Sequence, residues 1–158
     1  MISVVVVMGS TSDRAVMQVS EKTLGGLGID CEVKVLSAHR TPDALREWVR
    51  GLEGRGVKVV IAAAGGAAHL AGAIAAQTTL PVIGVPLASA NAIGGGLDAL
   101  LSTVQMPRGV PVATVAVGEA GAANAAILAA QILATADPAL GARIKTMRES
   151  MAMKVLGG

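Results

Sequence analysis

The sequence has almost no aromatic side chains: its 158 residues include one Trp, at position 48, and neither Tyr nor Phe. Proteins that bind single-stranded nucleic acid stack bases on aromatic rings, so this class is excluded. Charge is also scarce, since 15% of the residues are charged and the net charge is +2. The 13 Lys and Arg are scattered along the chain, which argues against a surface for duplexes. We expect no nucleic-acid partner.

Cysteine is represented by Cys31 alone, which excludes an internal disulfide and a multi-cysteine zinc site and fits a reducing compartment. Segment 59–76 carries no formal charge, but it is mostly Ala and Gly and contains His69. A membrane-spanning helix needs about 20 strongly apolar residues. The first residues lack the basic start and cleavage site of a signal peptide. We expect a cytoplasmic protein without a membrane partner.

Small residues are abundant instead: 30 Ala and 20 Gly make up about a third of the chain. The mean hydropathy of +0.62 and the low charge exclude intrinsic disorder. The length suits a single domain, 1–158, with its own core. Because that core is poor in large side chains, we expect subunit association to supply part of the burial.

Apolar β-branched runs alternate with helical patterns along the chain. The run from Ile2 to Met8 is continuous, as in a strand that is buried on both faces of a parallel sheet. Strands are expected at 2–8, 30–36, 57–63, 81–85 and 111–117, and helices at 13–24, 41–53, 69–77, 97–104, 121–134 and 138–156. With right-handed crossovers, this alternation predicts an α/β, three-layer αβα, flavodoxin-like fold. The expected sheet is parallel, with strand order 2-1-3-4-5, and is followed by a C-terminal helix.

Ligands of such sheets bind beyond the carboxyl ends of the strands, at the point where the strand order reverses. The loops after the first three strands, 9–13, 37–42 and 64–69, should therefore meet, and they contain both histidines. In the first loop, the hydroxyls of Ser10, Thr11 and Ser12 suit a phosphate or a ribose hydroxyl, although plain capping of the next helix would also explain them.

The second loop carries His39, which can exchange protons near neutral pH, beside Arg40, which could clamp a phosphate. A solvated surface loop is the alternative. In the third loop, Gly65 and Gly66 allow a ligand close to the backbone. His69 is at least as readily explained as a structural residue as a catalytic one. Two histidines without nearby Asp, Glu or Cys make a poor metal site, so no metal is expected.

Six segments together resemble the PurE family, the phosphoribosylaminoimidazole carboxylase catalytic subunits. They are VMGSTSD (7–13), SAHRTP (37–42), AGGAAHL (64–70), PVIGVP (81–86), QMPRGVPV (105–112) and AGAANAAILAAQIL (120–133). They occur in family order and cover nearly the whole chain. The chain departs from the family pattern at Ala71, where Pro is common, and in segment 91–96, which is richer in Gly.

The resemblance implies an isomerase of de novo purine (IMP) biosynthesis, an N5-carboxyaminoimidazole ribonucleotide mutase. Such an enzyme moves a carboxylate from the exocyclic nitrogen of an aminoimidazole ribonucleotide to ring carbon 4. It uses no metal, ATP or organic cofactor and forms a homo-octamer. His39 matches the family's general acid/base. The other matched substrate-binding positions are Ser10, Ser12, Asp13 and Arg40 for ribose and phosphate, Ser37 and Ala38 for backbone contacts, and Ala64, Gly65, Ala68, His69 and Leu70 around the carboxylate and the base.

Two alternatives remain. A second branch of the family carboxylates the unsubstituted ribonucleotide directly; it typically has Lys after the His and lacks GGAAH, so Arg40 and segment 65–69 favour the mutase branch. A flavodoxin-like binding or receiver module is the non-enzyme alternative. A receiver needs an acidic cluster after the first strand and Asp at the end of the third. Segment 10–13 and the pair Ala63–Ala64 stand there instead.

Overall fold

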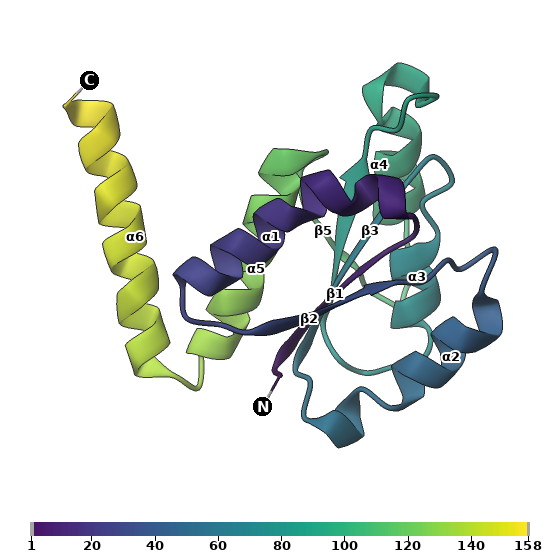
Figure 1. The fold of residues 1–158 in the computed structure, drawn as a ribbon, viewed down its shortest axis with the longest axis horizontal. Coiled ribbons are helices and arrows are strands. Elements are labelled where there is room, and N and C mark those ends of the chain that lie inside the picture. Colours follow the sequence, from purple (N-terminus) through teal and green to yellow (C-terminus); the bar gives the residue numbers. More distant parts are fainter. Residues whose placement is uncertain (1, 158) are drawn as a thin grey trace.

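A five-stranded parallel sheet lies at the centre of the computed structural model, which describes residues 2–157 (Figure 1). Its strands are β1 (Val4–Met8), β2 (Cys31–Val35), β3 (Val59–Gly65), β4 (Val82–Leu87) and β5 (Ala113–Thr114). All pairings are parallel and the order is β2-β1-β3-β4-β5. The predicted flavodoxin-like topology is confirmed.

Helices cover both faces of the sheet. They are α1 (Arg14–Gly26), α2 (Pro42–Arg50), α3 (Leu70–Ala75), α4 (Leu97–Val104), α5 (Glu119–Ala134) and α6 (Pro138–Leu156), with short 3-10 turns at Thr11–Asp13, Glu53–Arg55 and Ile93–Gly95. Val4 and Val6 belong to the core beneath α1 and α5, whereas Val5 and Val7 belong to the core beneath α2 and α3. Both sides of β1 are thus buried, which explains its unbroken apolar run.

The alanines and glycines allow close packing of α5. An added Cβ on Gly121 would lie 1.7 Å from the carbonyl oxygen of Ala116, so only glycine fits there. The face of α5 that meets the sheet and α1 is lined by Ala122, Ala125, Ala126, Ala129 and Ala130, all fully buried. Ser20 of α1 donates a buried hydrogen bond of 2.7 Å to the carbonyl of Ala122. Small side chains therefore bring these two helices together.

Some element ends differ from the expected ones. Helix α1 runs through the Gly25–Gly26 pair and ends at Gly26, with Leu27 as its C-cap before Gly28 with φ +74°, whose left-handed conformation suits a helix terminus. Helix α2 stops at Arg50 rather than near Glu53. Strand β5 has two residues instead of seven, because it is an edge strand that pairs with β4 only at Ile83 and Gly84.

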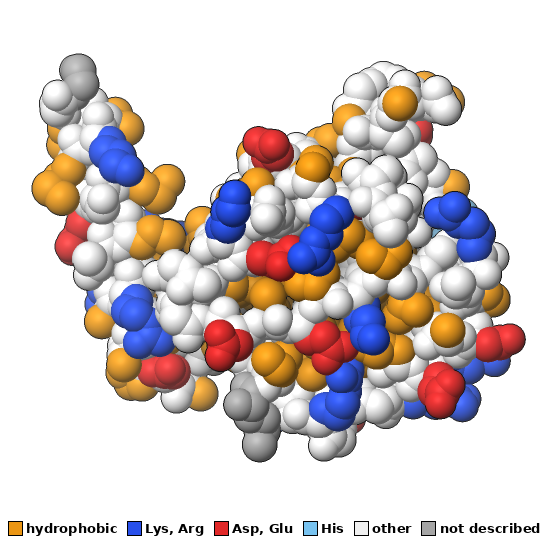
Figure 2. All heavy atoms as spheres, in the orientation of Figure 1, with side chains coloured by type: hydrophobic (Ala, Val, Ile, Leu, Met, Phe, Trp, Pro, Cys, Tyr) orange, Lys and Arg blue, Asp and Glu red, His pale blue; other side chains and the backbone are white. Residues whose placement is uncertain are grey.

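Helix α6 extends away from the sheet, and only Leu140 and Ile144 in its first half are buried (Figure 1). Its far end exposes Met151, Met153, Val155 and Leu156. On the face in Figure 2, acidic and basic side chains are interspersed rather than gathered into a basic patch. Within residues 2–157, none of the helices combines the length and apolar character that a membrane crossing requires.

Candidate active site

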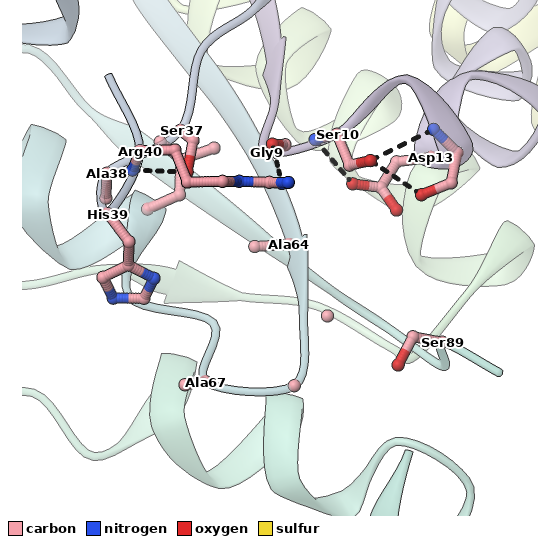
Figure 3. A pocket seen from close by; sticks show the side chains of 14 residues that line it. Gly9, Ser10, Asp13, Ser37, Ala38, His39, Arg40, Ala64, Ala67 and Ser89 are labelled. Atoms are coloured by element: carbon pink, nitrogen blue, oxygen red, sulfur yellow. Dashed lines mark hydrogen bonds between the residues drawn. The ribbon is translucent and has the colours of Figure 1, made fainter. Parts of the chain in front are cut away.

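A pocket of about 420 Å³ opens at the carboxyl ends of the strands, where the loops after β1, β2, β3 and β4 converge (Figure 3). It is lined by Gly9, Ser10, Ser12, Asp13, Ser37, Ala38, His39, Arg40, Ala64, Gly65, Gly66, Ala67, Leu70 and Ser89. All the residues expected to bind substrate are in this lining except Ala68 and His69. The loops after β1, β2 and β3 therefore meet at the carboxyl edge of the sheet, as the strand order predicts.

The first loop is held by its own side chains. The Ser10 backbone N–H donates to Asp13 Oδ2 over 3.1 Å, and the Ser12 N–H donates to Ser10 Oγ over 3.3 Å. The Ser12 hydroxyl also lies 2.9 Å from Ser10 Oγ. These contacts form a capping box around the 3-10 turn Thr11–Asp13, with Ser10 as its N-cap, whereas Asp13 at the N-cap of α1 makes no side-chain capping bond to that helix. The same groups line the pocket, and capping and ligand binding do not exclude each other.

Partial burial of Asp13 is the main electrostatic feature of the first loop. Burial raises the pKa of this carboxyl above its ordinary value of 3.8. Hydrogen bonds from the Ser10 backbone and from Ser12, and the charge of Arg40, oppose the shift without cancelling it. A group that donates a hydrogen bond to Asp13 would stabilise its ionised form.

In the second loop, hydrogen bonds fold the backbone back on itself. Thr41 Oγ1 accepts from the Ser37 N–H over 2.9 Å and donates to the Ser37 carbonyl over 3.1 Å. The Arg40 N–H donates to Ser37 Oγ over 3.1 Å. Thr41 stands at the N-cap position of α2, but its hydroxyl serves this turn and caps no helical N–H. The loop thereby presents His39 and Arg40 to the pocket.

Arg40 joins the first two loops. Its guanidinium donates to the Gly9 carbonyl over 3.3 Å, as Figure 3 shows. The Gly9 N–H in turn donates to the Ala63 carbonyl at the end of β3 over 3.1 Å. Arg40 keeps further N–H donors beyond this bond, and a phosphate could accept from them.

The third loop needs both of its glycines, for different reasons. An added Cβ on Gly65 would lie 3.0 Å from the Leu87 carbonyl oxygen and 3.3 Å from Ser89 Cβ, so the end of β4 and the loop after it leave no room. Gly66 has open space but φ is +61°, a conformation that favours glycine. Ala68 is buried below the pocket surface.

The two histidines contact each other. His39 Nε2 lies 2.9 Å from His69 Nδ1, and the rings are nearly perpendicular, with centroids 4.9 Å apart. His39 lines the pocket, whereas His69 stands behind it at the N-terminus of α3. Among residues 2–157, no three His, Cys, Asp or Glu side chains are grouped so that they could hold a metal ion.

The fourth loop supplies a residue that the sequence analysis missed. Ser89 follows β4 and lies across the pocket from His39 (Figure 3). Ligands bind beyond the carboxyl ends of the strands, and this holds for β4 as well, so the same reasoning would have included the loop that carries Ser89. In the first turn of α4, Asp98 accepts hydrogen bonds from the N–H groups of Ile93 and Ala99, over 3.0 and 2.8 Å.

Comparison with known proteins gives consistent matches over nearly the full length. The sequence profile of the family described as AIR carboxylase matches residues 3–154. The N5-carboxyaminoimidazole ribonucleotide mutases of Haemophilus influenzae and Escherichia coli K12 are each 53% identical over 153 residues, covering 97% of this chain and 92% and 89% of theirs. The crystal structure of Treponema denticola PurE superposes with a TM-score of 0.89 at 28% identity, covering 99% of this chain and 96% of that one.

Proposed function

Because the chain belongs to the AIR carboxylase family, we propose that it converts N5-carboxyaminoimidazole ribonucleotide into 4-carboxy-5-aminoimidazole ribonucleotide, an isomerisation of purine biosynthesis. The relatives that are 53% identical and named as mutases support this activity. The observation that carries the proposal is one pocket in which His39, the serine hydroxyls and Arg40 converge around a floor of Ala and Gly.

The polar side of the pocket suits the ribose phosphate. The Arg40 guanidinium and the hydroxyls of Ser10 and Ser12 can donate hydrogen bonds to phosphate oxygens, and charged donors strengthen such bonds. Asp13 can accept from ribose hydroxyls, which would offset the cost of its burial. This division follows from the chemistry of the two ligand groups: the phosphate is an acceptor, and the ribose hydroxyls are donors.

The small residues of the third loop suit the base and the migrating carboxylate. Ala64 and Gly65 leave space for a flat imidazole beside the backbone, and no aromatic residue lines the pocket to stack on it. A carbon dioxide molecule released between the two half-reactions must not escape. A small site from which water is excluded keeps it next to carbon 4.

The proposed reaction needs one proton donor that later becomes an acceptor. Protonated His39 gives a proton to the carbamate nitrogen. The carbon–nitrogen bond then breaks, its electron pair stays on nitrogen, and carbon dioxide forms. Carbon 4 of the enamine-like ring attacks carbon dioxide and forms the new carbon–carbon bond. Neutral His39 removes the carbon-4 proton, whose bonding electrons restore the aromatic ring, and the histidine regains its charge.

Replacement of His39 tests this role. We expect His39→Asn to abolish measurable turnover, because a positioned acid/base contributes about 10²- to 10⁴-fold and both proton transfers need it. Titration calorimetry should still detect binding of the product nucleotide, since the phosphate and ribose contacts remain. A variant that turns over at nearly the normal rate would contradict the assignment.

The choice between the two branches of the family is tested with substrates. Wild-type enzyme should convert N5-carboxyaminoimidazole ribonucleotide without added bicarbonate. Efficient carboxylation of aminoimidazole ribonucleotide at low bicarbonate would instead favour the direct carboxylase. Both experiments use wild-type enzyme, so their outcomes do not depend on the result for His39→Asn.

We also propose that the protein assembles into a homo-octamer. Four exposed apolar residues, Ile93, Leu97, Leu101 and Val104, follow one another at spacings of four, four and three along α4 and the turn before it. The apolar end of α6 is a second exposed surface. A second copy of the chain would cover such surfaces and add burial to a core made of small side chains. Analytical ultracentrifugation should give a mass near eight chains of 15.6 kDa, and an active monomer at micromolar concentration would contradict the proposal.

A further inference from the structure

The contact between His39 and His69 has no role in the reaction described so far. It joins residues that lie 30 positions apart, on the loops after β2 and β3, and these are the two histidines of the chain. Packing does not demand it, because both side chains are exposed. A distance of 2.9 Å between ring nitrogens requires one hydrogen between them.

The geometry distinguishes the two nitrogens of His39. Nε2 is the atom that meets His69 Nδ1. In Figure 3 the other ring nitrogen of His39 faces Ala64 across the pocket, while Nε2 points away from it. A ligand in the pocket would therefore meet Nδ1. An imidazole that exchanges protons at one nitrogen works best when the other nitrogen holds a fixed hydrogen bond.

We propose that His69 is a positioning residue, which accepts a hydrogen bond at Nδ1 from His39 Nε2–H and so reserves His39 Nδ1 for proton exchange with the substrate. His69 then carries its own proton on Nε2. The inference rests on the proposed function for its catalytic part, whereas the tautomers are properties of the unliganded protein.

The proton inventory is consistent through the cycle. Charged His39 has a hydrogen on each nitrogen, and the one on Nδ1 goes to the carbamate nitrogen. Neutral His39 then keeps its Nε2 hydrogen, still donated to His69, so that the Nδ1 lone pair faces carbon 4 and accepts the second proton. His69 neither gains nor loses a proton.

Nitrogen-15 NMR of the ring nitrogens tests the tautomers directly. With two histidines in the chain, the long-range spectrum contains only two ring systems, and His39→Asn assigns them. In neutral wild-type protein, both rings should carry hydrogen on Nε2. His69→Leu should turn His39 into a mixture of tautomers. A His39 ring protonated on Nδ1 in the wild type, or one that His69→Leu leaves unchanged, would overturn the proposal.

Kinetics separate positioning from a merely structural role. His69→Leu should lower kcat about 10- to 100-fold, the usual cost of removing a partner that orients a functional imidazole, with KM unchanged. His69→Asn should recover most of the activity, because its amide oxygen can accept near the position of Nδ1. Undiminished kcat in His69→Leu, or equal losses in both variants, would overturn the proposal.

The tautomer measurement also keeps the inference separate from the proposed function. If wild-type enzyme failed to turn over the mutase substrate, the proposed function would be wrong, while the NMR result would still decide whether His69 holds His39. If both His69 variants proved unstable in thermal melts, the wild-type spectrum alone would decide.

Discussion

The loops after β1, β2 and β3 differ from the loop after β4 in how they are held. Arg40 bonds to Gly9, Gly9 bonds to Ala63, and His39 meets His69, so the first three loops are tied to one another. The fourth loop places Ser89 in the pocket, but Asp98, which accepts from the Ile93 N–H, belongs to its own following helix. The side of the pocket with charged groups is therefore cross-linked between its loops, whereas the opposite wall is joined to the third loop by the helix behind it, where Ser102 of α4 donates to the Gly66 carbonyl over 3.3 Å.

Loss of the Arg40 side chain, on the cross-linked side of the pocket, should change substrate binding more than the other substitutions below. Arg40→Gln unties the first two loops and removes the positive charge that we assign to phosphate. A hydrogen bond to a charged group contributes about 1.5–3 kcal/mol, so KM should rise about 10- to 100-fold, with a smaller change in kcat. Steady-state kinetics measure both values.

Arg46→Gln is the matched control for this variant. Arg46 is exposed on α2 and does not line the pocket, so its replacement should leave KM unchanged. Equal effects of the two substitutions would mean that general charge, rather than the position of Arg40, attracts the substrate.

A methyl group at Gly65 should push the loop after β3 away from the loop after β4. In Gly65→Ala the new Cβ meets the Leu87 carbonyl and Ser89, and such overpacking costs about 1–3 kcal/mol. We expect a lower free energy of unfolding in urea together with weaker substrate binding, because Ser89 is displaced.

Gly54→Ala is the control for this change, since its Cβ would meet nothing within 4 Å. It should leave both stability and binding intact. If Gly65→Ala kept full affinity, the wall formed by Ser89 would have no part in binding.

Asp13→Asn should have the smallest effect. It should change how the free energy of unfolding depends on pH. Burial raises the pKa of its carboxyl above 3.8, so the folded state favours the protonated form. Below pH 3.8 the carboxyl is protonated in both states, and its contribution to the free energy of unfolding is fully present. As pH rises from 3.8 through the raised pKa, ionisation lowers the free energy of unfolding. Asp13→Asn avoids this loss, and its amide oxygen can still accept from the Ser10 N–H.

Urea unfolding from pH 3 to pH 7 measures the difference between wild type and variant. The stability of Asp13→Asn relative to wild type should increase with pH, even though the variant binds substrate less well. A relative stability that falls with pH would mean that the capping interactions outweigh burial in the folded protein.

Much of the fold could be predicted because each strand has a simple pattern. The run 4–8 is apolar at every position because β1 contacts both cores. Element ends were less predictable. Gly25, Gly26 and Gly28 together indicate a helix stop after about Leu24, but an added Cβ at Gly25 or Gly26 would meet nothing, and the helix continues through this pair to Gly26. The shortening of β5 depends on its place at the sheet edge, which no local pattern encodes.

The pocket was predictable to the extent that backbone topology determines it. Strand order brings the segments of Ser10, His39 and Gly65 to one edge. The pairing of His39 with His69 depends on side-chain orientation, and no spacing in the sequence indicates it. The sequence therefore left His69 undecided between a structural and a catalytic role, whereas the structure provides the contact from which its positioning role is inferred.

A crystal structure with bound 4-carboxy-5-aminoimidazole ribonucleotide would test the central claim most directly. We predict the phosphate beside Arg40 and Ser10, the imidazole against Gly65, and His39 Nδ1 within hydrogen-bonding reach of the reacting atoms while Nε2 stays on His69. A nucleotide bound outside this pocket, or one whose base lies beyond the reach of His39, would contradict it.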